Sequence, residues 1–294
     1  MYRVVESLGR NTCLGIRFWD AVTGGFVRDT LRVSAFPMSG PRKLLDATQN
    51  RSGVYAFNHL PGLREIEQRA DDDFYLVSPS DQRSFVVEVR DTSGDFLDVG
   101  FIVDLPLPYP GVYLSDPLSS PPEGVPKGVN LFSSIKRTPP PMVAAIRAEL
   151  VDADTDAPAA HAVMSVRTED GYRWYGVSNN EGKVAVLMPY PMLVDGLGGS
   201  PHEGGPGMLS VQTWTLAVDI RYSPELVDRL PLSSLVDYAT VLNQPPAEVW
   251  LERAAVDVTP LATLDVPLRY GEDVVLKTDG LSTLMVTPVA SPPS

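Results

Sequence analysis

Residues 20–23 (DAVT) and 152–155 (DADT) are two copies of one short stretch, and they decide how this chain is organised. Each copy follows a run in which apolar and polar residues alternate, at 14–19 and 145–150. Farther along, residues 50–57 (NRSGVYAF) match 179–186 (NNEGKVAV), and Leu60-Pro61 matches Met188-Pro189. Collinear matches at similar spacing indicate an internal duplication. The sequence therefore predicts two related domains in tandem.

Both matched motifs are typical of turns. Asp and Thr side chains bond nearby backbone amides and close a turn, and Gly reaches the positive φ that a tight hairpin needs. We expect Gly53 and Gly182 to occupy equivalent hairpin positions, and Asp20 to superpose on Asp152. The predicted turn and fold-defining residues are Asp20, Thr23, Gly24, Asn50 and Gly53 in the first copy, and Asp152, Thr155, Asn179 and Gly182 in the second.

The rest of the pattern is that of a β protein. The chain has 294 residues with 28 Pro and 23 Gly, which disfavours helical bundles. Alternation predicts strands at 31–35, 84–90, 210–222, 264–270, 273–278 and 283–287. Short helices are predicted at 233–243, capped by Ser233 or Ser234, and at 225–230. The predicted class is all-β, with two tandem β-sandwich domains and one or two short helices in the second.

A proline-rich stretch separates the two copies. Residues 105–141 hold ten prolines and show neither a strand nor a helix period. We therefore expect a first sandwich over 1–105, a linker or arm over 106–141, and a second, related sandwich with insertions over 142–290. A loop over 196–207 is almost entirely Gly, Pro and polar residues.

Charge and cysteine content narrow the classes of partner. The formal net charge of −13 disfavours nucleic-acid binding. Cys13 is the only cysteine, so no intrachain disulfide forms and a reducing compartment is favoured. The first ten residues do not resemble a signal peptide, and no apolar run is long enough to span a membrane. We expect the chain to assemble in the cytoplasm. Later release as part of a larger particle is an open alternative.

No catalytic, cofactor or metal site is predicted. His59, His161 and His202 lie far apart, without the spacing of a zinc site. Asp152, Asp154 and Asp156 imitate the start of a calcium loop, but Ala157 stands where such a loop needs Gly. A solvated turn explains those carboxylates better, and no nucleophile motif has its partner residues.

The first copy resembles the carboxypeptidase regulatory-like (transthyretin-like) β-sandwich. The resemblance rests on Asp20, Thr23, Gly24, Asn50, Gly53, Tyr55, Phe57 and Leu60-Pro61-Gly62. The second copy departs from it, with Asp156 for the turn Gly and Val184 and Val186 for the aromatics. The resemblance implies an accessory module without catalytic residues.

Residues 15–21, 52–57, 60–64 and 189–191 are also similar to two-domain β proteins encoded with bacterial contractile injection systems, which are phage-tail-like particles. This resemblance implies a non-enzymatic structural subunit at an end complex, the baseplate or the cap, present in several symmetric copies. Its partners would be sheath, tube, baseplate or cap proteins. The alternative is an extracellular or surface binding module, an adhesin or a carbohydrate-binding sandwich, against which the missing secretion signal counts.

The arm carries apolar residues that could contact a partner. The candidates are Tyr109, Tyr113, Leu131, Phe132 and Ile135. We expect the arm to become ordered on a neighbouring subunit with Phe132 as an anchor, because aromatic burial there would favour binding. The alternative is that these residues fold back on their own domains.

Overall fold

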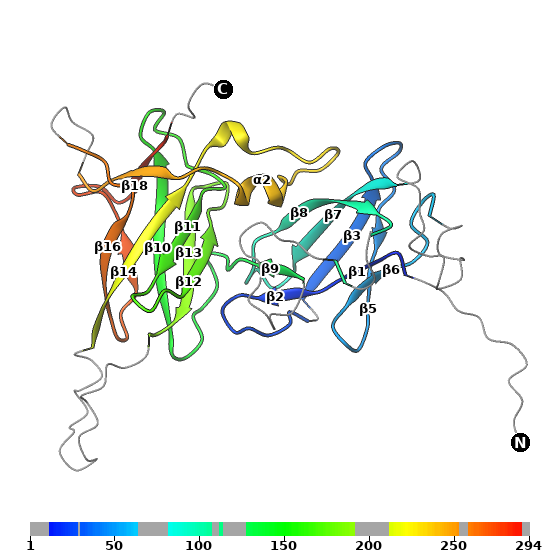
Figure 1. Cartoon of the computed structure of the whole chain (residues 1–294), viewed down its shortest axis with the longest axis horizontal. Coiled ribbons are helices and arrows are strands. Elements are labelled where there is room, and N and C mark those ends of the chain that lie inside the picture. The colour runs from blue at the N-terminus through cyan, green and yellow to red at the C-terminus, as the bar shows by residue number, and fades with distance from the viewer. Residues whose placement is uncertain are drawn as a thin grey trace, which may run out of the picture.

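The computed structural model describes residues 12–28, 30–63, 82–107, 112–113, 128–191, 212–252 and 258–289. Two β-sandwiches lie side by side, the first on the right of Figure 1 and the second on the left. Each has its own hydrophobic core. The predicted all-β sandwich class is confirmed.

The first sandwich consists of two facing sets of strands. One sheet has the order β4 (Leu45–Asp46), β3 (Leu31–Pro37), β7 (Arg83–Asp91) and β8 (Val99–Leu105). The other has the order β1 (Leu14–Ile16), β6 (Tyr55–Phe57) and β5 (Thr48–Gln49), and the chain continues from β1 into β2 (Phe18–Asp20), which pairs in parallel with β9 (Val129–Leu131). Aromatic and branched side chains such as Phe18, Phe57 and Phe85 fill the space between the sheets and are fully buried.

The second sandwich repeats this arrangement, and its strands are longer in the sheet that corresponds to β1-β6-β5. One sheet has the order β12 (Arg173–Val177), β11 (Val163–Arg167), β14 (Thr213–Arg221) and β16 (Leu264–Arg269). The other has the order β13 (Lys183–Pro189), β10 (Val143–Asp152), β18 (Leu284–Pro288) and β15 (Ala247–Trp250), with β17 (Val274–Leu276) also paired to β10. Alternate residues of β14, from Trp214 to Ile220, point into the core as their period-2 pattern predicts.

Strand registers in the two sandwiches correspond. Leu14 faces Phe57 across β1 and β6, and Ile146 faces Val186 across β10 and β13. The last strand also corresponds, because β9 pairs in parallel with β2 just as β18 pairs in parallel with β10. The duplicated sequence therefore encodes a duplicated topology.

This correspondence changes the expected boundary of the first domain. Residues 129–131 form its last strand, and Leu131 and Phe132 lie in its core. Asn130 faces Trp19 across β9 and β2. From the sequence we expected this domain to end at residue 105. Strand β9 has only three residues, which are too few to show an alternating strand pattern in a proline-rich stretch. The connection between the sandwiches shrinks to residues 138–142.

The predicted helices are shorter than expected. The structure has a 3-10 helix, η4 (Pro224–Leu226), and an α-helix, α2 (Tyr238–Leu242). Asp237 caps α2 by accepting a hydrogen bond from the Ala239 amide. Ser233 and Ser234 do not cap a helix but lie in a hairpin, because Leu230 and Leu235 pair through their backbones.

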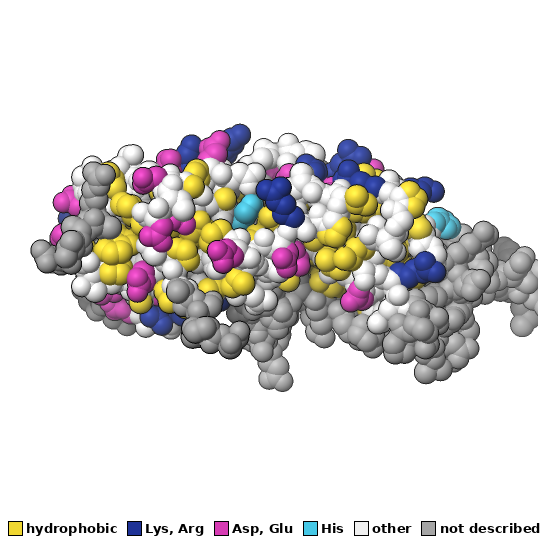
Figure 2. Space-filling view, turned by 90° about the horizontal axis from the view of Figure 1, so that it is seen from above, with side chains coloured by type: hydrophobic (Ala, Val, Ile, Leu, Met, Phe, Trp, Pro, Cys, Tyr) yellow, Lys and Arg dark blue, Asp and Glu magenta, His cyan; other side chains and the backbone are white. Residues whose placement is uncertain are grey.

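The two sandwiches form one continuous surface. Figure 2 shows that Asp and Glu side chains gather mainly over the half that holds the second sandwich, whereas Lys and Arg are denser toward the first. Within the described part of the chain, no helix is long and apolar enough to cross a membrane.

Candidate functional site

The two Asp turns share several hydrogen bonds. The Asp20 carboxylate accepts from the Val22 amide at 3.0 Å, and Asp152 accepts from Asp154 at 2.9 Å. The residue that closes each turn has positive φ, with φ 66° at Gly24 and φ 55° at Asp156. Thr23 and Thr155 each accept a hydrogen bond from the amide two residues later. These carboxylates are therefore turn-formers, as predicted.

The two Asn turns are also equivalent. Asn50 Oδ1 accepts from the Ser52 and Val54 amides, and Asn179 Oδ1 accepts from the Glu181 and Lys183 amides. Gly53 has φ 75° and Gly182 has φ 77°. The expectation that both glycines occupy one hairpin position is confirmed.

The first Asp turn has an additional partner. Arg137 Nη2 lies 2.6 Å from Asp20 Oδ2, with both side chains nearly buried. Burial raises the pKa of the Asp20 carboxyl, but hydrogen bonds from Arg137, Val22 and Thr23 outweigh it, and the pKa lies below its ordinary value. This bidentate pair ties the end of the 128–137 segment to the turn after β2.

Residues 223–243, called the clasp here, connect the second sandwich to the first. They leave the second sandwich between β14 and β15 and reach toward the first (Figure 1). In the first sandwich, the place of β15 is taken by Phe96, which forms a bridge with Ser133. Only a short turn lies between the end of β7 and Phe96. The clasp is therefore an insertion found in the second copy alone.

The tip of the clasp covers the outer face of the first sandwich. Leu230 is 3% exposed and shares a small apolar cluster with Phe36 and Val86, against which Ile102 and Leu235 also pack. Asp237 forms a parallel bridge with Gly100 at the edge of β8. A side chain at position 100 would collide with Leu230, so Gly100 permits the close approach.

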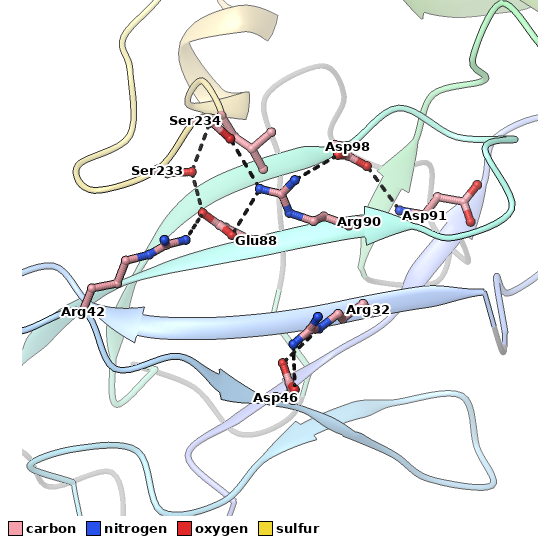
Figure 3. A network of polar contacts seen from close by, with 10 residues as sticks. Arg32, Arg42, Asp46, Glu88, Arg90, Asp91, Asp98, Ser233 and Ser234 are labelled. Atoms are coloured by element: carbon pink, nitrogen blue, oxygen red, sulfur yellow. Dashed lines mark hydrogen bonds and ion pairs between the residues drawn. The ribbon is translucent and has the colours of Figure 1, made fainter.

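Polar contacts also join the clasp to this face, and Figure 3 shows Ser233 and Ser234 of the clasp beside Glu88 and Arg90 of β7. Glu88 is buried on the outer face of β7. It accepts a 2.6 Å hydrogen bond from Ser233 and forms a 3.0 Å ion pair with Arg42. Arg90 reaches Ser234 at 3.4 Å and pairs with Asp98. The buried carboxylate is compensated from both sandwiches, which makes its burial tolerable.

The base of the clasp is fixed as well. Tyr238 donates a 2.7 Å hydrogen bond to the Asn130 carbonyl, and its ring lies 5.7 Å from that of Phe132. Gln244 donates to the His161 carbonyl and accepts from the Ser223 amide. Tyr238 thus holds the clasp to the first sandwich, and Gln244 holds its start at Ser223 to the second.

A cavity of about 370 Å³ remains where the sandwiches meet. Apolar side chains, among them Leu97, Phe132 and Val177, share its wall with Lys136 and His161. Burial lowers the pKa of His161, and the charge of Arg229 lowers it further. Both effects favour the neutral form of the imidazole at the contact between the sandwiches.

The predicted partner-contact residues have different positions. Leu131 and Phe132 are 1% and 4% exposed in the first core, so the expectation that Phe132 anchors on a neighbouring subunit is corrected in favour of folding back. Tyr113 stacks on Phe101 with ring centroids 5.2 Å apart. Ile135 lines the cavity, and its carbonyl accepts from Arg147. Tyr109 and the loop over 196–207 lie outside the described residues.

The search for metal ligands gives no cluster among the described residues. Asp152 and Asp154 lie in a closed turn, in which the Asp152 carboxylate accepts from backbone amides. Its neighbour Tyr222 has a raised pKa, caused by burial and by Asp152. The clasp was the element that sequence reasoning missed. One signal pointed to it: Val86 lies between Phe85 and Val87, and a strand that is apolar on both faces is covered on both faces.

Comparison with known proteins gives only distant matches. No family model matches the chain, and no curated protein matches it. Among solved structures, the shaft pilin SpaA from Lactobacillus rhamnosus GG is 9% identical with a TM-score of 0.23, covering 95% of this chain and 100% of that one. BcpA, the major pilin subunit of Bacillus cereus, is 9% identical with a TM-score of 0.24, over 95% of this chain and 60% of that one. A putative adhesin from Bacteroides ovatus is 10% identical with a TM-score of 0.22, over 86% and 82%. Scores this low identify neither a family nor a function.

Proposed function

We propose that this chain is a non-enzymatic structural subunit that works through protein–protein contacts. The observation that carries the proposal is the clasp, which joins two duplicated sandwiches into one body through an apolar cluster and a buried, compensated carboxylate. A fixed relative orientation of two modules is what a scaffold needs, because any partner that touches both then finds one preformed surface.

We further propose the setting that the sequence resemblance implies, an end complex (baseplate or cap) of a contractile, phage-tail-like particle. In that setting the partners are sheath, tube, baseplate or cap proteins. The buried ion pair of Asp20 and Arg137 supports a structural role for the most conspicuous carboxylate of the first motif, since its oxygens are occupied by Arg137, Val22 and Thr23.

The test is co-sedimentation of an epitope-tagged chain with sheath and tube proteins in particles purified from the native cells. We expect the tagged chain in the particle fraction, and a Leu230→Asp variant, whose clasp is broken, at a much lower level. A Leu226→Asp variant is the matched control, because Leu226 is 49% exposed on the same insertion. Wild-type chain that stays entirely in the soluble fraction would overturn the particle setting, and its binding to intact cells would favour a surface binding module.

A further inference from the structure

The connection between the sandwiches is short and strained. Arg137 is fixed to the first sandwich by Asp20, and β10 begins at Val143, which leaves five residues, 138–142, between them. Residues 139–141 are all proline. Met142 has φ 65°, a left-handed conformation that non-glycine residues rarely adopt, and it is 63% exposed. The Val143 amide donates to the Pro140 carbonyl at 3.2 Å, so the chain turns sharply here.

The contacts between the sandwiches do not depend on this connection. Ser233 with Glu88 and Tyr238 with Asn130 join residues more than a hundred positions apart. The outer apolar cluster likewise joins Leu230 of the clasp to Phe36 and Val86. The same donors, acceptors and apolar surfaces are available to the second sandwich of another copy. If residues 138–142 open and the sandwiches of two chains exchange, each of these pairs forms again between the chains and none is lost.

We propose that this chain associates with a second copy of itself by exchanging its second sandwich. The clasp of one chain then covers the β3–β7–β8 face of the other, and residues 138–142 are the hinge. Short hinges under strain favour this exchange, because an extended hinge relieves the turn while every interface contact is kept. Five extended residues reach at most about 18 Å, which lets the hinge pass between neighbouring chains.

The smallest closed product is a two-fold dimer. Each chain supplies one clasp and one receiving face, so reciprocal exchange satisfies both chains and leaves no face uncovered. This inference deepens the proposed structural role by naming a partner. Its test uses the isolated chain, so a failure here leaves the co-sedimentation experiment unaffected.

The test varies the hinge and measures mass by light scattering after refolding at high protein concentration. We expect the wild-type chain to give a dimer fraction. A variant that lacks Pro139 and Pro140 should become fully dimeric, because its shortened hinge no longer permits the turn. Inserting a flexible Gly-Ser stretch after Pro141 should return the chain to the monomer. Met142→Gly should lower the dimer fraction several-fold, because glycine adopts φ 65° without strain.

Complementation controls for unrelated self-association. In the chain lacking Pro139 and Pro140, Leu230→Asp removes the clasp contact and Val86→Asp removes the receiving face, so each variant alone should be monomeric. Mixed together, they should form a heterodimer through the one intact pair. A wild-type chain that is wholly monomeric after refolding overturns the proposal. So does a dimer fraction that survives Leu230→Asp in the full-length chain.

Discussion

Two glycines in equivalent turns have different surroundings. Gly53 and Gly182 share a positive φ, yet a Cβ at Gly53 would come no closer than 3.7 Å to Arg28, whereas one at Gly182 would collide with the Leu150 carbonyl. Any substitution that adds a Cβ therefore strains the backbone at both positions. At Gly182 the added Cβ also clashes with the backbone of Leu150.

We predict that Gly53→Ala lowers the free energy of unfolding by about 1 kcal/mol and Gly182→Ala by roughly 2–4 kcal/mol. Urea denaturation of the two variants measures the difference. Equal losses would mean that the chain around Leu150 and Gly182 shifts freely to make room.

The buried pair of Asp20 and Arg137 offers a second comparison between the copies. Asp20→Asn keeps the oxygen that accepts from Val22 but leaves Arg137 as an uncompensated buried charge. We predict a loss of about 3 kcal/mol in unfolding free energy. Because the folded pKa of Asp20 lies below its ordinary value, the stabilisation is present at neutral pH and is lost as the pH falls through that lowered pKa.

Asp152→Asn is the matched control, since its turn accepts the same backbone bonds and Tyr222 takes the place of a cation. We expect less than about 1 kcal/mol there. A similar loss at both positions in thermal melts would show that the turn, rather than the ion pair, carries the effect.

At the scale of elements, the clasp is the part that local patterns describe least well. Its helix was expected over 233–243, but only Tyr238–Leu242 is α-helical. Ser233 and Ser234 are good helix caps by residue type, yet a carboxylate and a guanidinium of the other sandwich bind them instead. The local structure at Ser233 and Ser234 is thus decided by residues about 145 positions earlier in the chain. The residue pattern of the clasp alone does not predict these contacts.

The strands were easier to predict because their signals are local. Alternation placed β3, β7, β14 and β16 within a few residues of their ends. Strand β9 was missed because its evidence is the pairing with Phe18 and Asp20, more than a hundred residues earlier. The turn residues were likewise predictable one by one, whereas Arg137, which completes the first turn, was not.

We predict that Leu230→Ala loosens the clasp without unfolding either sandwich. Removing the buried side chain costs about 2–3 kcal/mol, and the loss falls on the contact between the domains rather than on either core. Limited proteolysis should show faster cleavage within 223–243, while the strand signal in circular dichroism stays unchanged. Leu232→Ala, at an exposed position of the same hairpin, should cleave at the wild-type rate, and global unfolding of Leu230→Ala would contradict the prediction.

At the scale of the whole molecule, the contact between the sandwiches should respond to acid through His161. Its pKa is lowered by burial and by Arg229, so the folded state disfavours the proton that the unfolded state binds. Protonation of His161 therefore disfavours folding. The free energy of unfolding is highest above the ordinary histidine pKa near 6.5 and declines as the pH falls below it. Asp91, Asp98 and Lys136 also line the cavity beside His161.

We predict that His161→Asn flattens the loss of stability between about pH 6.5 and pH 5. Asparagine tolerates the left-handed backbone at this position, where φ is 62°, so the substitution tests the imidazole rather than the turn. Thermal melts across that range measure the effect. An unchanged pH profile would rule out His161 as the source of the loss, and Asp98 could not replace it, because burial raises the pKa of Asp98 and its protonation then favours the folded state.

In both sandwiches the first and last strands lie side by side and run in the same direction, β2 with β9 and β10 with β18. A pull on the two ends of either sandwich therefore drags neighbouring strands past each other along their length. Their hydrogen bonds then share the load together rather than opening one at a time. Such an arrangement resists stretching better than one whose end strands peel apart. A chain built of two such units, joined at 138–142, is suited to transmitting tension between whatever holds its two ends.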